Sequence, residues 1–307
     1  MQDDGVDVDV NVAADGGGKE AGVTIEDVMG AVIRFQVATE ALAALGARLA
    51  SPPDAIPAPV ATAIDEVLAA AGLSGLDELT PQQRMMASGM ARTVFGQAAD
   101  LLAAPERAPG WSHTDVAVLE GQGRGSMAVP GLLAQTEEFG GVTSFLDVGT
   151  GVGWLVVAAA QLWPEATIVG IDLWEPALER ARQNFAGAGV AERVELRRQS
   201  VTDLDDTDRF DLTWFPSFFI APEALPAAFS RVLRATRPGG RIAVGRFDPP
   251  ADPLARATQR LRTVRDGGTS LDEADAVRLL TAAGWTDVRP LPRTGPVPML
   301  FVVGRKG

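Results

Sequence analysis

The chain has 307 residues, with 40 acidic side chains against 27 lysines and arginines, a single histidine and no cysteine. The missing cysteine excludes disulfides, thiolate metal sites, iron–sulfur clusters and cysteine nucleophiles, and the lone His113 excludes clustered-histidine metal sites. A net charge of −13 is unfavourable for nucleic acid and for an anionic membrane surface, because both carry negative charge themselves. We therefore expect a soluble, cytoplasmic protein that binds no metal, nucleic acid or membrane.

The N-terminal third is expected to be a tail followed by helices. Residues 1–22 are rich in Asp, Glu and Gly and lack the positive charge that begins a secretory signal, which predicts a disordered acidic tail. Apolar residues from Val28 to Leu49 recur mainly at spacings of three and four, which predicts a helix that ends at Ser51-Pro52-Pro53. No apolar run in this sequence reaches the roughly 18–20 residues of a membrane span.

Two more helices and a loop complete the N-terminal region. The helices are expected over residues 57–71 and 81–104, the latter with Thr80 as its N-cap. Residues 105–126 contain glycines at 110, 121, 123 and 125 and are expected to form a loop. We take residues 23–126 as one helical region. It is expected to act as a lid and a homodimerising surface, or else only to support the following domain.

From residue 127 the expected fold is α/β, because short β-branched runs alternate with helical stretches. Helices are expected at 154–162, 175–187, 222–235, 252–265 and 271–283, and strands at 142–148, 167–171, 194–198, 210–214, 241–245, 286–289 and 299–303. This alternation predicts a doubly wound, mostly parallel seven-stranded sheet, in a domain over 127–307 with an N-terminal helical extension. The last strand is expected to be antiparallel, because no helix separates it from the strand before.

The segment Phe145-Leu146-Asp147-Val148-Gly149-Thr150-Gly151-Val152-Gly153-Trp154 runs from a strand through a glycine-rich turn into a helix. In such sheets ligands bind at the carboxyl ends of the strands, and glycine lets a cofactor approach the backbone. The next strand ends in Asp172, whose carboxylate can accept hydrogen bonds from both hydroxyls of a ribose.

Two cofactor classes fit this arrangement. A dinucleotide fingerprint would have a third glycine where this chain has the bulky Trp154. Asp147 at the strand end repels a pyrophosphate but suits a cationic ligand. S-adenosylmethionine is such a ligand, since it carries a sulfonium, an ammonium and a ribose. A nicotinamide oxidoreductase is therefore disfavoured.

At these residues the chain resembles the class I (Rossmann-like) S-adenosylmethionine-dependent methyltransferases, of the bacterial small-molecule type. The resemblance extends over roughly residues 143–304 and adds three further motifs. These are Gly170-Ile171-Asp172, Phe210-Asp211-Leu212-Thr213-Trp214 and Leu233-Arg234-Ala235-Thr236-Arg237-Pro238-Gly239-Gly240-Arg241.

The resemblance implies S-adenosylmethionine as cofactor, S-adenosylhomocysteine as product, and a set of contacts. Asp147 and the glycine loop would face the methionine moiety, Asp172 the ribose, and Leu173 and Trp174 the adenine. The place of the family's adenine-binding acid is taken by Gln199-Ser200-Val201, so that Ser200, or else Asp203, would accept the bond from the adenine amino group. The implied cofactor residues are Asp147, Gly149, Thr150, Gly151, Gly153, Asp172, Leu173, Trp174, Ser200, Val201 and Phe215.

The remaining candidates are open between a functional and a structural role. Arg124 or Ser126 would fold over the carboxylate of the cofactor, or would belong to a plain connector. His113 is a candidate base, with Asp115 and Glu120 as alternatives, but a lone loop histidine is more often structural. Aromatic residues that either form core or line a pocket for a flat apolar substrate are Trp111, Trp214, Phe215, Phe218 and Phe219.

The favoured function is methyl transfer from S-adenosylmethionine to a small, apolar or aromatic metabolite, with an O, N or C acceptor atom left open. Such transfer depends chiefly on positioning and desolvation, so a chain without Cys or Tyr can perform it. The alternative is a cofactor-binding protein of the same fold without methyl transfer, either a scaffold or a catalyst of a non-methylating rearrangement. This alternative stays open because the exit of the fourth strand, Pro216-Ser217, carries no acid or amide side chain.

Overall fold

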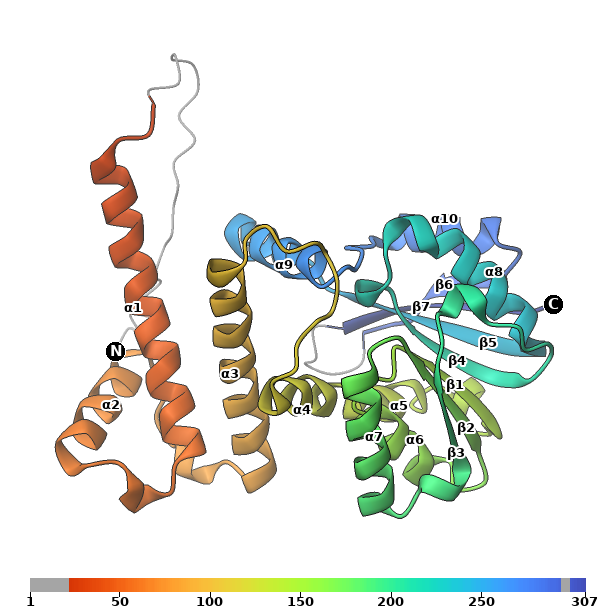
Figure 1. Ribbon diagram of the computed structural model, residues 1–307, viewed down its shortest axis with the longest axis horizontal. Coiled ribbons are helices and arrows are strands. Elements are labelled where there is room, and N and C mark those ends of the chain that lie inside the picture. The colour runs from red at the N-terminus through yellow and green to blue at the C-terminus, as the bar shows by residue number, and fades with distance from the viewer. Residues whose placement is uncertain (1–21, 294–298) are drawn as a thin grey trace, which may run out of the picture.

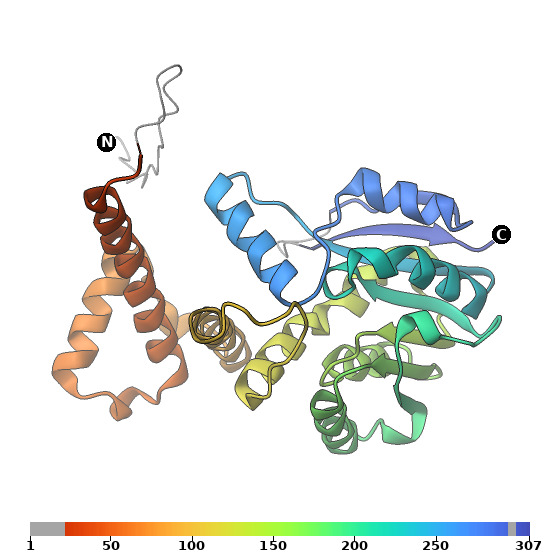
Figure 2. The ribbon, with the colours of Figure 1, turned by 45° about the horizontal axis from the view of Figure 1, so that its top comes forward.

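A computed structural model describes residues 22–293 and 299–307. The predicted acidic tail lies outside the described residues except for Gly22, as does part of the connection between the last two strands. Figures 1 and 2 show two parts, a group of N-terminal helices and a sheet domain with helices on both faces. The predicted α/β fold with an N-terminal helical extension is confirmed.

The first three helices form where the sequence predicts them, as α1 (Ile25–Ala50), α2 (Ala58–Ala70) and α3 (Pro81–Ala103). Thr24 and Thr80 cap α1 and α3, each accepting a hydrogen bond from the backbone N–H three residues later. The chain turns to an extended conformation at Ser51, because Pro52 and Pro53 cannot continue α1. Single-turn 3₁₀ helices follow at Pro53–Ala55 and Leu76–Glu78.

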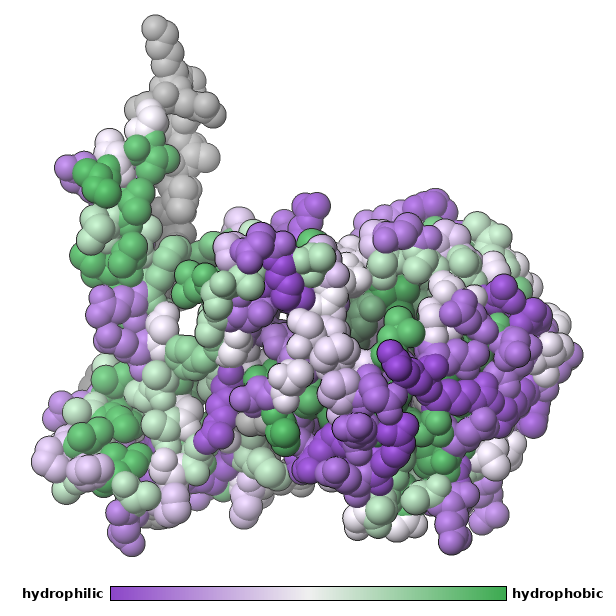
Figure 3. All heavy atoms as spheres, in the orientation of Figure 1, coloured by the Kyte–Doolittle hydropathy of each residue, from purple (hydrophilic) through white to green (hydrophobic). Residues whose placement is uncertain are grey.

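The N-terminal half of α1 stands away from the rest of the molecule, and its apolar side chains face solvent (Figures 1 and 3). At least 45% of each of these side chains is exposed: Ile25, Val28, Met29, Val32, Ile33, Phe35 and Val37. By length and composition alone α1 is apolar enough to cross a membrane, a test that helices of soluble proteins also pass. The sequence expectation that no segment reaches this length is therefore wrong for α1.

The predicted loop over residues 105–126 is wrong in its second half, which forms helix α4 (Val116–Gly125). Its glycines serve close packing. A Cβ on Gly121 would lie 3.3 Å from the Gly89 carbonyl of α3, and one on Gly123 would lie 2.3 Å from Val152 Cγ2. Glycine lowers helix propensity, but here it lets α4 approach α3 and the glycine loop. Residues 126–139 continue as the 3₁₀ helix Ser126–Ala128, α5 (Val129–Leu133) and the 3₁₀ helix Glu137–Phe139.

The sheet has seven strands in the order β3-β2-β1-β4-β5-β7-β6. They are β1 (Ser144–Val148), β2 (Thr167–Asp172), β3 (Val194–Arg198), β4 (Phe210–Pro216), β5 (Thr236–Phe247), β6 (Thr286–Pro290) and β7 (Met299–Arg305). The first five run parallel, and β7 is antiparallel to both β5 and β6. The strand order reverses between β1 and β4, and their carboxyl ends are the place where ligands bind in such sheets.

Helices cover both faces of the sheet, which explains why central strands such as β1 and β4 are buried on both sides. The helices are α6 (Trp154–Leu162), α7 (Glu175–Ala188), α8 (Leu225–Ala235), α9 (Pro253–Arg265) and α10 (Glu273–Ala282). Side chains of α5, α6 and α7 pack on one face, and those of α8 and α10 on the other. α9 lies instead beside α3 (Figure 1) and contacts the segment that joins α3 to α4.

Candidate active site

The glycine loop between β1 and α6 lies against the end of β2. The backbone N–H groups of Gly149 and Thr150 donate to the Ile171 carbonyl at 2.9 and 3.0 Å. Gly151 has a φ of +53°, and a Cβ placed on it would meet nothing within 4 Å, so that a ligand can approach this part of the loop. A Cβ on Gly153 would lie 2.3 Å from the Phe185 ring of α7. Gly153 therefore lets α7 pack closely on the loop, and its role as a cofactor residue stays a prediction.

Asp147 ends up buried beneath this loop, with 1% of its surface exposed. Its Oδ2 accepts a hydrogen bond of 2.8 Å from the Thr150 hydroxyl. Burial, aided by the nearby charge of Asp172 and opposed by the Thr150 bond, raises the pKa of Asp147 to about 7. The carboxylate therefore holds a proton over part of the neutral range, and a cation placed beside it would favour its charged form.

Asp172 connects the glycine loop to the start of α7. Its two carboxylate oxygens accept hydrogen bonds of 2.8 Å from the backbone N–H groups of Gly151 and Trp174. Burial raises the pKa of Asp172, and these bonds partly offset it. The side chain of Leu173 beside it is 63% exposed. A second, partly buried carboxylate in the same place makes the site suited to a ligand with positive charge and hydroxyl donors.

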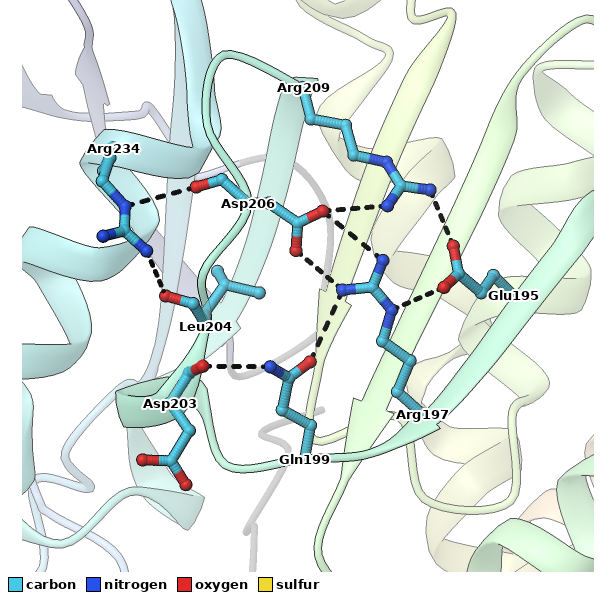
Figure 4. A network of polar contacts seen from close by, with 8 residues as sticks. All are labelled: Glu195, Arg197, Gln199, Asp203, Leu204, Asp206, Arg209 and Arg234. Atoms are coloured by element: carbon cyan, nitrogen blue, oxygen red, sulfur yellow. Dashed lines mark hydrogen bonds and ion pairs between the residues drawn. The ribbon is translucent and has the colours of Figure 1, made fainter.

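The segment after β3, which includes Ser200 and Val201, is fixed by a network of charged side chains (Figure 4). The Arg197 guanidinium lies between Glu195 and Asp206, at 2.7 Å from each carboxylate, and Arg209 contacts the same two acids. Gln199 donates to the Asp203 carbonyl, so its amide is already engaged.

Within that segment, Ser200 caps the 3₁₀ helix Val201–Asp203. Its hydroxyl oxygen lies 2.7 Å from the hydroxyl of Thr202 and accepts from the backbone N–H of that residue at 3.2 Å. Val201 is 6% exposed. The network thus holds both predicted adenine neighbours in one conformation.

Two of the predicted aromatic residues, Trp214 and Phe215, lie buried at the end of β4. Trp214 packs against Phe301 of β7 at 5.8 Å between ring centroids, and Phe215 packs against Phe229 of α8 at 4.7 Å. Both are at most 3% exposed, because successive residues of a strand covered on both faces are all buried. Both thus belong to the core, which was the structural alternative for them, and their roles beside substrate and cofactor stay predictions.

The other predicted aromatic residues do come together. Trp111 contacts Phe219 at 5.5 Å, Phe219 contacts Phe218 at 4.9 Å, and Phe218 contacts Phe247 at 4.3 Å. Phe247, at the end of β5, is an addition that sequence reasoning missed. We call these four side chains the aromatic group. Single-turn 3₁₀ helices at Ser217–Phe219 and Pro222–Ala224 lead from β4 to α8.

His113 lies beside the aromatic group and faces a carboxylate. Its ring contacts Trp111 at 4.7 Å, and its Nε2 is 3.7 Å from Oδ1 of Asp266, beyond hydrogen-bond distance. Its carbonyl accepts a bond of 2.9 Å from the Trp174 indole. Asp266 comes 153 residues later in the chain, so no local pattern could have identified it.

Glu120 of α4 is the centre of a second cluster and is not suited to act as a base. It accepts hydrogen bonds from Trp154 at 2.7 Å, Arg180 at 2.5 Å and Asn184 at 3.1 Å. Burial disfavours its charge, but these three bonds outweigh burial and lower the pKa of Glu120. The cluster joins α4 to α6 and α7, and Asn184 also binds the Val152 carbonyl of the glycine loop.

The remaining candidates of this region have partners of their own. Arg124 forms an ion pair with Glu120 at 3.4 Å and lies 4.1 Å above the Trp154 ring. The Ser126 hydroxyl donates to the Gly123 carbonyl at 2.6 Å. Asp115 accepts from the Val118 N–H at 3.1 Å, at the start of α4. Arg124 thus lies next to the glycine loop, whereas Ser126 and Asp115 have local bonds.

Comparison with known proteins identifies the domain around the glycine loop. Residues 145–240 match the family model described as a methyltransferase domain. The chain contains a class I methyltransferase domain. The resemblance predicted from the sequence motifs is thereby confirmed, and this methyltransferase domain includes both Asp147 and Asp172.

Similar solved structures extend over nearly the whole chain at low identity. A structure of PigF with SAH is 21% identical, covers 92% of this chain and 100% of that chain, and has a TM-score of 0.64. The mitomycin 7-O-methyltransferase MmcR is 18% identical, with coverages of 92% and 98% and a TM-score of 0.65. At this identity the likeness establishes the fold.

Curated relatives match the methyltransferase domain only in part. The tRNA1(Val) (adenine(37)-N6)-methyltransferase of Vibrio campbellii is 38% identical over 66 residues, which are 22% of this chain and 28% of that protein. The chain thus matches less than a third of the length of this relative.

Proposed function

We propose that the protein transfers a methyl group from S-adenosylmethionine to a small molecule and releases S-adenosylhomocysteine. The observation that carries this proposal is a pair of carboxylates, the buried Asp147 and the partly buried Asp172, held on a glycine loop at the reversal point of the sheet. Two acids that are wholly or partly buried need a compensating positive charge or hydrogen-bond donors, and the sulfonium, ammonium and ribose of this cofactor provide them.

Each part of the cofactor would meet a different element. We propose that Asp147 and the backbone of Gly149, Thr150 and Gly151 hold the methionine moiety and that Asp172 binds the ribose. Leu173 and Trp174 would border the adenine on one side, with Ser200 and Val201 near its edge. Arg124, next to the glycine loop, would bind the carboxylate of the cofactor, as a guanidinium suits that anion.

The chain would contribute geometry more than reactive groups. When bound, S-adenosylmethionine supplies a methyl group that its sulfonium already activates. The aromatic group at the β4 exit would exclude water and hold a small apolar or aromatic acceptor in line. If the acceptor atom is a hydroxyl oxygen, we propose that His113 takes its proton while the new O–C bond forms.

A small-molecule acceptor is favoured by charge and by the solved structures. The net charge of −13 leaves little attraction for the phosphates of RNA. The mitomycin 7-O-methyltransferase shares the fold of almost the entire chain, whereas the tRNA methyltransferase matches a short stretch only. An acceptor RNA remains an outcome that the experiments below can reveal.

Isothermal titration tests the proposal directly. S-adenosylmethionine and S-adenosylhomocysteine should each bind one site per chain, whereas NADH should not bind. Absence of heat with both sulfur ligands would overturn the proposed function. Methyl-labelled S-adenosylmethionine should then label small molecules of a deproteinised extract more than total tRNA, and preferential labelling of tRNA would reject the small-molecule acceptor.

One observation favours a second candidate, a protein that binds the cofactor without transferring its methyl group. Ser217, the polar side chain at the β4 exit, donates its hydroxyl to the Gly245 carbonyl at 2.8 Å and is fully buried. The exit thus offers the acceptor no side-chain base of its own. Tight binding with no labelled product in the extract experiment would support this candidate.

We also propose that the N-terminal helices form a homodimer. The exposed apolar side chains in the N-terminal half of α1 need a partner surface, and a second copy can supply an equivalent one. Sedimentation equilibrium in detergent-free buffer should give twice the chain mass, and Phe35→Lys should shift the protein toward monomer. A wild-type monomer, or solubility that requires detergent, would overturn this proposal.

A further inference from the structure

A cavity of about 380 Å³ lies between α3, α9 and the segment that joins α3 to α4. Its volume is within the range of small-molecule sites, about 300–1,000 Å³. None of its lining residues belongs to the glycine loop or to the ends of β1, β2 and β4. It is therefore distinct from the proposed cofactor site.

The cavity has an apolar wall and a polar end. Val94, Ala98 and Leu101 of α3 and Leu261 of α9 form the wall. At the polar end, His113 and Asp266 face each other at 3.7 Å, with about nine-tenths of each side chain buried. This division suits a small molecule with an apolar body and one polar group.

Two buried nitrogen atoms at the polar end have no hydrogen-bond partner. They are Nε2 of His113 and Nε of Arg107, and both residues line the cavity. Buried polar atoms are nearly always bonded, and an orphan in a cavity wall indicates a missing partner, either water or a ligand. Nε of Arg107 can only donate, so its missing partner is an acceptor, whereas Nε2 of His113 donates or accepts according to its tautomer.

The charges around the cavity favour a negative ligand. Arg107 and Arg265 both contact Oδ2 of Asp100, at 3.1 and 2.6 Å, so one carboxylate faces two guanidinium groups. Arg262 also lines the cavity, and among the described residues its side chain has no ion-pair or hydrogen-bond partner. Three arginines against two aspartates give a local positive balance in a chain whose net charge is −13.

The cavity adjoins the place where the acceptor would sit. The Trp111 ring contacts both His113, which lines the cavity, and Phe219 of the aromatic group. The β4 exit has no free polar side chain, because the Ser217 hydroxyl is already bonded to the Gly245 carbonyl. Recognition of a polar group on the acceptor must therefore come from another element.

We propose that this cavity binds the methyl acceptor and selects one with an anionic oxygen group, a carboxylate or phenolate, on a small apolar body. Arg262 pairs with the anionic group, and Nε of Arg107, which has no other partner among the described residues, donates a hydrogen bond to it. His113 lines the same cavity and remains available for the proton transfer proposed above. The identity of the ligand as the acceptor rests on the proposed function, whereas the preference for an anion does not.

The single histidine makes the test direct, because ring-labelled histidine gives the signals of one imidazole. We would titrate the full-length protein, saturated with S-adenosylhomocysteine, with benzoate, benzamide and benzylamine, which share a ring and differ in charge. Benzoate should shift the His113 signals saturably and bind at least tenfold tighter than the other two. No shift with benzoate at millimolar concentrations, or tighter binding of benzylamine, would overturn the anion preference.

A matched pair of variants locates the binding. Arg262→Gln should weaken benzoate binding at least fivefold, whereas Arg260→Gln, an exposed residue of the same helix outside the cavity lining, should change it less than twofold. Equal effects of the two variants would indicate general screening and reject the site. Asp266→Asn removes a negative charge from the cavity lining and should strengthen benzoate binding while leaving S-adenosylhomocysteine affinity unchanged.

Nuclear Overhauser contacts decide whether the ligand is an acceptor. Bound benzoate should show contacts to Trp111 and Phe219 as well as to α3. Contacts to α3 and α9 alone would place it in a separate site and overturn the acceptor assignment. If S-adenosylhomocysteine fails to bind while benzoate still binds to the ligand-free protein, the proposed function fails and the anion preference stands.

Discussion

The glycine loop and the cavity between α3 and α9 are built in different ways. The loop takes its two acids, Asp147 and Asp172, from the ends of adjacent parallel strands, 25 residues apart in sequence. The cavity takes His113 and Asp266 from a connecting segment and the end of a distant helix. The loop is therefore determined by local sequence and sheet register, whereas the cavity exists only after the helical region docks on the domain.

This difference has a functional meaning. A loop fixed by backbone hydrogen bonds to a buried strand suits an invariant ligand, which the proposed cofactor is. Residues that line a cavity between surface helices can be substituted without disturbing the sheet. We expect substitutions at the loop to affect stability and cofactor binding together, and substitutions at the cavity to affect acceptor binding alone.

The largest expected effect concerns the proton on Asp147. Burial raises its pKa from the ordinary value of 3.8 to about 7, so the folded state binds this proton more tightly than the unfolded state. The resulting stability is fully present below pH 3.8 and is lost as the pH rises through 7. The loss of unfolding free energy approaches about 4 kcal/mol, since each unit of difference between the two pKa values corresponds to about 1.4 kcal/mol.

Urea unfolding between pH 4 and pH 8 measures this effect in the ligand-free protein. The free energy of unfolding should decline with pH in the wild type and much less in Asp147→Asn, which cannot ionise. Affinity for the cationic S-adenosylmethionine should rise as the pH approaches 7, because the cation requires the charged carboxylate. Parallel pH profiles for wild type and variant would contradict the assignment.

The next effect sharpens the role of Asp172. Asp172→Ala removes the acceptor of two backbone hydrogen bonds and of the proposed ribose contact. S-adenosylhomocysteine should bind about 100-fold more weakly, or about 3 kcal/mol, by isothermal titration. The exposed Asp205 offers a control of the same chemistry, and Asp205→Ala should bind as the wild type does. An equally tight Asp172→Ala variant would reject the ribose role.

Two glycines of α4 test how closely that helix packs on the glycine loop. Gly123→Ala places a Cβ 2.3 Å from Val152 Cγ2 and should cost about 1–3 kcal/mol of unfolding free energy through overpacking. Gly125→Ala has open space around its Cβ and should stabilise the protein by up to about 1 kcal/mol through helix propensity. If both variants gain stability in thermal unfolding, α4 does not lie against the loop.

The smallest effect concerns the charged network after β3. Asp206→Asn removes the negative charge that pairs with Arg197 and Arg209. Both arginines retain their ion pairs with Glu195 (Figure 4). We expect a loss of about 1 kcal/mol in unfolding free energy and a reduction of S-adenosylhomocysteine affinity by less than about fivefold. Asp65→Asn, which affects the exposed pair with Arg48, should leave that affinity unchanged. A large loss of affinity would mean that the network contacts the cofactor directly.

The strands and the loop could be predicted because their signals are local. The run from Phe145 to Gly153 contains its strand, its turn and its acid in nine residues, and Thr80 with Pro81 marks the start of α3. Helix α4 was missed because three glycines normally indicate a loop, and only the proximity of Gly89 and Val152 explains two of them, Gly121 and Gly123. For Trp214 the sequence left core and pocket open, because it does not reveal which aromatic side chains of a doubly covered strand are buried.

By itself the sequence determined the order of the strands and helices along the chain, the family resemblance and the two acids that mark the cofactor site, because each depends on short-range patterns. The tertiary structure decided what surrounds them. It placed Asp266 against His113, Glu120 among Trp154, Arg180 and Asn184, and two arginines on Asp100. These contacts join residues up to 165 positions apart, and their energies depend on burial and distance, which exist only once the helical region and the sheet have packed together.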